Sequence, residues 1–132
     1  MTRPYILDTD TVSYAFRDVG RVVAHIKQHT PSGICISAIT LAELRFGASQ
    51  KGSKRIHGLI DSFISQVPVM PFDDAAASKF GEIAAVLSAS GVSIGDFDTM
   101  IGAHALDLDA TLVTNNVRHF RRIVGLRVET WV

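Results

Sequence analysis

Short apolar segments alternate with longer amphipathic segments along the whole of this 132-residue chain. The short segments are partly β-branched, as expected of strands covered on both faces, and they fall at residues 5–7, 34–37, 67–70, 110–114 and 127–129. Strands that alternate with helices form a parallel sheet with helices on both of its faces. We therefore predict a three-layer α/β/α fold with a central, mostly parallel sheet of about five short strands.

The amphipathic segments between these strands keep the spacing of helices. Apolar residues recur every three or four positions at Val19, Val22, Val23 and Ile26, at Ile56, Leu59, Ile60, Phe63 and Ile64, and at Phe80, Ile83, Ala84 and Leu87. No linker or repeat interrupts the pattern, and the length suits one core, so we predict a single domain over residues 1–132.

The composition argues for a cytoplasmic protein. No apolar run approaches the roughly 18 residues of a membrane span. The N-terminus enters the first strand directly, which leaves no room for a secretion signal. Cys35 is the only cysteine, so no disulfide framework is expected.

Three acidic residues, Asp8, Glu43 and Asp98, each lie at or near the end of an apolar segment. Ligands of parallel sheets bind beyond the carboxyl ends of the strands, and Asp8 follows the first strand. Two carboxylates about 4 Å apart repel each other by roughly 4 kcal/mol at an effective dielectric near 20. Either a proton or a cation must therefore neutralise a shared site. A divalent cation is the favoured interpretation.

Helix capping offers an alternative explanation for two of these acids. Asp8 precedes an expected helix and has the side chain of a good N-cap, although one cap does not account for both Asp8 and Asp10. Thr40-x-x-Glu43 matches a capping box. If Ser37 caps that helix instead, Glu43 falls in the second turn and can point back toward the sheet edge. The spacing leaves both arrangements open.

Asp98 is preceded by a second acid, Asp96, in Gly95-Asp96-Phe97-Asp98. A helix N-terminus favours an anion rather than a bare cation. Asp98 must therefore reach a cation by the direction of its side chain. Gly102 and Ala105 lie on the same helical face as Asp98 and are predicted to pack closely on the sheet.

Other polar residues at strand ends have two interpretations. Thr114 and Asn116 end the fourth strand, where they suit either a bound water or phosphate oxygen, or a local Asx turn. The five histidines show no ligand spacing, which argues against zinc. We expect His104 to be satisfied by neighbours in its own helix.

Charge is unevenly distributed although the formal net charge is zero. Residues 73–109 hold seven acids and one lysine, and basic stretches flank them at Arg45, Lys51, Lys54 and Arg55 and at Arg118, Arg121, Arg122 and Arg127. This pattern suits a metal-dependent enzyme acting on a polyanion. It equally suits ordinary solvated helix faces.

Taken together, the motifs resemble PIN-domain ribonucleases, and specifically the VapC toxins of toxin–antitoxin pairs. The resemblance covers the chain in order, through Leu7-Asp8-Thr9, Ser37-x-x-Thr40-x-x-Glu43 with Gly47, Ile94-Gly95-x-x-Asp98-x-x-Ile101, Val113-Thr114-Asn115-Asn116-x-x-x-Phe120, and Gly125-Leu126 to Trp131. It implies an endoribonuclease that uses Mg²⁺, or alternatively Mn²⁺, to activate a water. It also implies a cognate antitoxin, an RNA substrate and a homodimer.

Carried over by position, the resemblance makes Asp8, Glu43 and Asp98 the catalytic and metal-binding triad, with Asn116 at the fourth catalytic position. Asp10 and Asn116 depart from the family pattern: position 10 is often Asn or Ser, and the fourth position is frequently Asp. Secondary or uncertain roles go to Thr9, Asp10, Asp96 and Thr114. Contacts to the RNA backbone are expected from Lys51, Lys54, Arg118 and Arg121.

Two rival functions fit parts of the chain. A haloacid-dehalogenase-like phosphatase would use Asp8 as nucleophile and Asp10 as acid, with Thr114 or Ser37 on the phosphate. The chain, however, has no lysine well placed between the motifs of such a phosphatase, and Glu43 would have no role in its reaction. A non-catalytic receiver-like or PIN-like binding module is the other rival, but a receiver domain needs an Asp at the end of the third strand, where Met70 stands.

Overall fold

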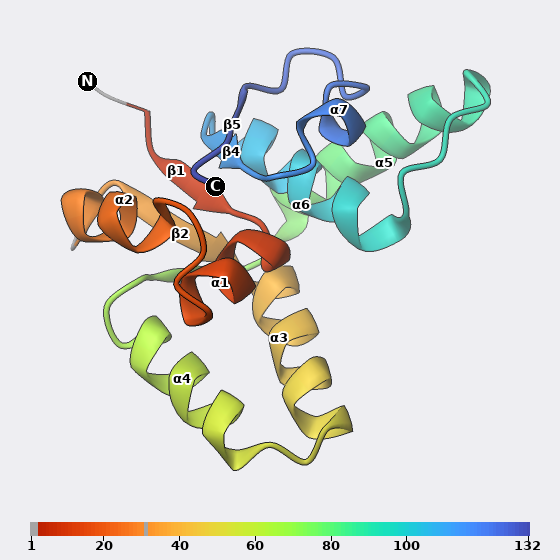
Figure 1. Ribbon diagram of the computed structural model, residues 1–132. Coiled ribbons are helices and arrows are strands. Elements are labelled where there is room, and N and C mark those ends of the chain that lie inside the picture. The colour runs from red at the N-terminus through yellow and green to blue at the C-terminus, as the bar shows by residue number, and fades with distance from the viewer. Residues whose placement is uncertain (1–2, 31) are drawn as a thin grey trace.

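The computed structural model describes residues 3–30 and 32–132, so Met1, Thr2 and residue 31 of the predicted domain lie outside it. Its five strands are β1 (Tyr5–Leu7), β2 (Ile34–Ser37), β3 (Val69–Met70), β4 (Thr111–Val113) and β5 (Val128–Glu129). They form one sheet in the order β3-β2-β1-β4-β5, with every pair parallel (Figure 1). The predicted sheet is confirmed, and the last three predicted strands are each one or two residues shorter in the structure.

Seven helices are present in the described residues: α1 (Thr9–Phe16), α2 (Val22–His29), α3 (Ala38–Gln50), α4 (Lys54–Ile64), α5 (Asp74–Ala89), α6 (Asp96–Asp107) and α7 (Val117–Phe120). Successive strand residues point to opposite faces, so Leu7 and Ile36 join the core beneath α1 to α4, whereas Ile6 and Cys35 join the core beneath α5 to α7. This is the predicted three-layer arrangement. No helix within the described ranges is long and apolar enough to cross a membrane.

The register of the sheet aligns the ends of its three central strands. Leu7 of β1 pairs with Ile36 of β2 on one side and with Val113 of β4 on the other. The residues that follow Leu7 and Val113, Asp8 and Thr114, therefore emerge at one edge. This edge carries the candidate site.

His104 makes a buried contact across the molecule rather than within its own helix, so the local partner predicted for it is wrong. Its Nδ1 lies 2.9 Å from Oγ of Ser37. That Oγ also accepts a hydrogen bond from the Ile39 N–H, at 3.0 Å. Burial lowers the pKa of His104. The bond arises because α6 packs over the end of β2, a proximity that local spacing does not reveal.

Gly102 faces the segment that follows α7, not the sheet that its helical position suggested. A Cβ placed on Gly102 would lie 2.5 Å from Cδ1 of the buried Ile123. The glycine therefore admits the segment that follows α7. Ala105 belongs to the core cluster on the sheet, with Leu112 and Ile6, so the predicted packing on the sheet holds for Ala105 and not for Gly102.

The last residues of the chain are anchored beside α2. Trp131 is 2% exposed and stacks on His25 and His29, with ring centroids 4.6 and 5.6 Å away. Its indole N–H donates to Glu129 at 2.6 Å, and its carbonyl accepts from the Arg21 N–H at 2.9 Å. One aromatic side chain thus joins β5 to α2.

Candidate active site

Asp8 caps a helix and lines a cavity at the same time. As N-cap of α1 it accepts a hydrogen bond from the Thr11 N–H, at 2.9 Å. It is 4% exposed, and burial raises the pKa of its carboxyl, although bonds from Thr114 and Thr11 oppose this shift. The capping interpretation is therefore correct for Asp8. It does not account for a nearly buried carboxylate that faces a cavity.

Glu43 lies in the second turn of α3, because Ser37 is the N-cap of that helix. This excludes the alternative in which Thr40 caps. The Thr9 hydroxyl donates to Oε1 of Glu43 at 2.6 Å. Burial is the main cause that raises the pKa of Glu43, and the charges of Asp98, Asp10 and Asp8 raise it further. The Glu43 carboxylate is therefore close enough to the other three acids for their charges to repel it.

Asp98 lies in the first turn of α6 but does not cap it, since Gly95 holds the N-cap position. Its Oδ2 is 3.2 Å from Nε2 of His119. Burial raises the pKa of Asp98 and His119 opposes the shift, while Asp10 adds to it. Asp98 is therefore directed by its side chain toward the sheet edge, as expected from the sequence.

The three carboxylates share one cavity of about 210 Å³, whose lining residues are Asp8, Thr9, Asp10, Glu43, Asp98, Asn116 and Phe120. Asn116 is exposed at the start of α7, and its N–H donates to the Thr114 hydroxyl at 2.9 Å, as in the turn anticipated for this segment. Folding thus brings residues from four separate parts of the chain to one polar pocket.

Two of the residues given secondary or uncertain roles lie elsewhere. Asp96 lines a different hollow, together with Ser88 and Ser93. Thr114 is fully buried behind Asp8 rather than in the lining. Sequence reasoning missed His119, because only the fold brings α7 against Asp98.

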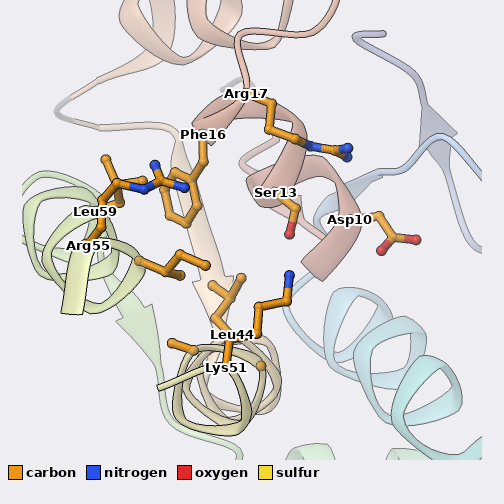
Figure 2. A pocket seen from close by; sticks show the side chains of 11 residues that line it. Asp10, Ser13, Phe16, Arg17, Leu44, Lys51, Arg55 and Leu59 are labelled. Atoms are coloured by element: carbon orange, nitrogen blue, oxygen red, sulfur yellow. The ribbon is translucent and has the colours of Figure 1, made fainter. Parts of the chain in front are cut away.

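A second depression of about 460 Å³ meets the acidic cavity at Asp10, which lines both. It lies between α1, α3 and α4, and Figure 2 shows Lys51, which follows the last residue of α3, extending toward α1. Its cations are Arg17, Lys51 and Arg55, and its apolar lining comes from Phe16, Leu44, Ala48, Ile56 and Leu59. We call this depression the α1–α3–α4 groove.

Of the expected RNA contacts, only Lys51 lies in this groove. Lys54, Arg118 and Arg121 are exposed and line neither depression. Two other members of the basic stretches have partners: Arg45 pairs with Asp61, and Arg127 pairs with Asp109. The groove adds Arg17, which no sequence pattern singled out, and Arg55, which belongs to the first basic stretch but was not among the expected RNA contacts.

The lining of the cavity fits a hydrated divalent cation. Within the described ranges, no three His, Cys, Asp or Glu side chains converge closely enough to hold a metal ion as they stand. Mg²⁺, however, prefers oxygen ligands and keeps several waters, so the carboxylates need not all bind it directly. Asp8, Glu43 and Asp98 all have raised pKa values. A divalent cation bound there would favour the charged form of each carboxyl and so oppose these shifts.

Comparison with known proteins identifies the family. Residues 5–126 match the family model of the PIN domain. The chain belongs to the PIN-domain family. The tRNA(fMet)-specific endonuclease VapC of Salmonella typhimurium is 36% identical over 128 residues, which is 96% of this chain and 97% of that protein. Ribonuclease VapC2 of Haemophilus influenzae is 36% identical over 129 residues, covering 97% and 98%.

Solved structures show the same PIN fold. DNA-bound VapBC from Salmonella typhimurium matches with a TM-score of 0.91 and 34% identity, over 99% of this chain and 100% of that one. VapBC2 from Rickettsia felis, bound to a DNA fragment from its promoter, matches with a TM-score of 0.89 and 32% identity, over 97% and 98%. The resemblance to VapC nucleases that the motifs indicated is confirmed.

The PIN assignment leaves the phosphatase alternative without support. In that alternative Ser37 binds phosphate, but Ser37 is fully buried and bonded to Ile39 and His104. The alternative also gives Glu43 no part, whereas Glu43 lines the cavity with the two aspartates.

Proposed function

We propose that this chain is a metal-dependent endoribonuclease and the toxin of a toxin–antitoxin pair that acts in the cytoplasm. The observation that carries the proposal is the acidic cavity of Asp8, Glu43 and Asp98 at the carboxyl ends of the parallel strands. Support comes from the PIN-domain match and from relatives that are named as VapC ribonucleases.

In this proposal Asp8, Glu43 and Asp98 hold Mg²⁺ or Mn²⁺ with several of its waters. Such a cation would make a bound water more acidic and would neutralise charge on a phosphodiester. Asp8 is fixed by the Thr11 N–H, and Glu43 is fixed by the Thr9 hydroxyl. Both donors hold carboxylates at the wall of the cavity, so little reorganisation is needed when the substrate binds.

Asn116 and Asp10 have separate parts in this proposal. The amide of Asn116 offers a neutral oxygen where another carboxylate would add repulsion. Asp10 is exposed at the junction of the cavity and the α1–α3–α4 groove. Its charge acts on Glu43 and Asp98, so it modulates the affinity for the cation rather than serving as a catalytic acid.

The proposal is tested by RNA cleavage with the purified protein. Because a relative is named tRNA(fMet)-specific, the first substrate to try is initiator tRNA, with an elongator tRNA beside it. We expect cleavage with Mg²⁺, none with excess EDTA, and recovery with Mn²⁺. Cleavage that persists at full rate in EDTA, or hydrolysis of p-nitrophenyl phosphate without RNA cleavage, contradicts the proposal.

The α1–α3–α4 groove is proposed to hold the RNA backbone as the strand approaches the cavity. Arg17, Lys51 and Arg55 supply positive charge on the same side of the molecule as the shared residue Asp10. Phosphates bound to such side chains release counterions, which makes the binding salt-dependent. Arg118 and Arg121, exposed on and just after α7, extend the expected contacts past Asn116.

Replacing Lys51 by Gln is expected to raise the KM for RNA by about fivefold, with kcat unchanged, because a phosphate contact contributes on the order of 1 kcal/mol to binding. The slope of log KM against log salt should fall by about one. Lys79→Gln is the matched control, since Lys79 pairs with Glu82 on α5 and lines neither depression. Equal KM values and salt slopes for the two variants would remove the groove from the RNA path.

The partners follow from the solved relatives. The neighbours named above are VapBC complexes bound to DNA. We propose that this chain likewise binds a cognate antitoxin, which blocks the site, and that it forms a homodimer. Co-expression with a small DNA-binding protein encoded directly upstream should suppress cleavage. Light scattering of the purified chain should report twice the mass of one chain.

A further inference from the structure

His119 is the only one of the five histidines found in contact with a carboxylate of the cavity in the described residues. Its Nε2 lies 3.2 Å from Oδ2 of Asp98 and 2.7 Å from the carbonyl oxygen of Ile94. Ile94 precedes α6, and His119 lies on α7. The Nε2 atom of His119 therefore links α7 to the segment before α6 and to the Asp98 carboxylate.

The Ile94 carbonyl determines which atom carries hydrogen. A carbonyl oxygen can only accept a hydrogen bond, so Nε2 of His119 must be a donor. Its N–H bonds to the Ile94 carbonyl at 2.7 Å, and Oδ2 of Asp98 lies 3.2 Å from the same nitrogen. The Asp98 carboxylate thus always meets a donor at this position.

Packing also restricts the orientation of this donor. The His119 ring meets the ring of Phe120 edge to face, with centroids 5.5 Å apart and planes at 87°. Phe120 is 1% exposed, and it lines the acidic cavity. The imidazole is therefore held between a buried aromatic ring and a main-chain carbonyl, and it is not free to follow the carboxylate.

We propose that His119 is a positioning residue that holds Oδ2 of Asp98 and so leaves Oδ1 for the divalent cation and its waters. The inference rests on the proposed function of the same cavity. No other polar side chain is found paired with the Asp98 carboxylate in the described ranges. Thr9 holds Glu43 in a corresponding way. Groups that orient metal ligands in this manner typically affect metal affinity by about 10–100-fold.

The test measures Mn²⁺ binding to the protein without RNA, by the EPR signal of free Mn²⁺. His119→Ala should weaken Mn²⁺ binding by about 10–100-fold. His119→Gln, whose amide nitrogen can occupy the place of Nε2, should stay within about threefold of the wild type. With the Ala variant at saturating Mn²⁺, kcat should largely recover, and the KM for RNA should change little, because the RNA contacts are intact.

His29→Gln is the matched control for a purely structural effect. His29 is also half-buried and packed on an aromatic ring, but it stacks on Trp131, away from the cavity. Its variant should change the melting temperature without changing Mn²⁺ affinity. If His119→Ala binds Mn²⁺ like the wild type, or if the Gln variant loses as much affinity as the Ala variant, the inference is wrong. Failure of the wild type itself to bind Mn²⁺ would instead remove the proposed function, and this inference with it.

Discussion

Asp98→Asn is expected to reduce RNA cleavage by about 10³-fold or more, which corresponds to roughly 4 kcal/mol of lost transition-state stabilisation. The amide has nearly the shape of the carboxylate but carries no charge for the cation. Gel analysis of labelled RNA under single-turnover conditions measures the effect. Asp96→Asn is the control, since Asp96 lies in the same helical turn but lines another hollow. Cleavage at the wild-type rate by Asp98→Asn would show that the site is misassigned.

The same variant should be more stable than the wild type when no divalent cation is present. The pKa of Asp98 is raised in the folded state, mainly by burial, so above that pKa the charged form destabilises the fold. The penalty is present in full at neutral pH and is relieved as pH falls through the raised pKa toward 3.8. We expect the melting temperature of the variant to exceed that of the wild type at pH 7, and the difference to shrink on acidification.

Added Mg²⁺ should reverse this order. A ligand that binds only the folded state stabilises it in proportion to its affinity, and the variant lacks one charge for binding. Calorimetry at pH 7 with and without Mg²⁺ gives the comparison. A variant that is less stable than the wild type in EDTA would mean that Asp98 supports the fold rather than adding to the repulsion in the cavity.

Trp131→Ala is expected to lower the free energy of unfolding by about 3–5 kcal/mol, as large-to-small changes of buried aromatic residues do. The indole is 2% exposed and packs against His25, His29 and Tyr5. Since small domains are stabilised by only about 5–15 kcal/mol, the loss is a large part of the total. The melting temperature should fall by about 12 °C or more.

Two further substitutions separate the contributions of Trp131. Trp131→Phe keeps an aromatic ring but loses the N–H that donates to Glu129 at 2.6 Å, so it should cost only about 1–2 kcal/mol. Val124→Ala is the control on the surface, because Val124 is 87% exposed. Urea titration followed by circular dichroism measures all three. A loss below about 1 kcal/mol for Trp131→Ala would show that α2 and β5 are not joined through this ring.

The parts of the fold that could be predicted depend on local pattern. Strands β1 and β2 matched in full because most of their residues are apolar and buried on both faces. The strand predicted at 67–70 is shorter because Pro68 has no N–H for the sheet, although its carbonyl accepts from Ile36. The position of Asp8 followed from the rule that parallel strands end at one edge.

What could not be predicted depends on contacts between distant segments. The spacing did not decide whether Thr40 or Ser37 caps α3, although the identity of the cap determines in which turn of the helix Glu43 lies. The partner of His104 is 67 residues away. His119 faces Asp98 only because α7 packs beside the start of α6. Short hydrogen bonds of this kind leave no periodic signal in the sequence.

The hydrogen bond between Ser37 and His104 has a consequence for the kind of RNA that can be cut. Ser37 begins the helix that carries Glu43, and His104 belongs to the helix that carries Asp98. Spreading these two helices would leave a buried polar group unsatisfied, at a cost of about 1–3 kcal/mol. We therefore expect the mouth of the cavity to resist widening, which disfavours the entry of a base-paired stem. We expect unpaired loops, which bend readily, to be cut in preference to base-paired stems.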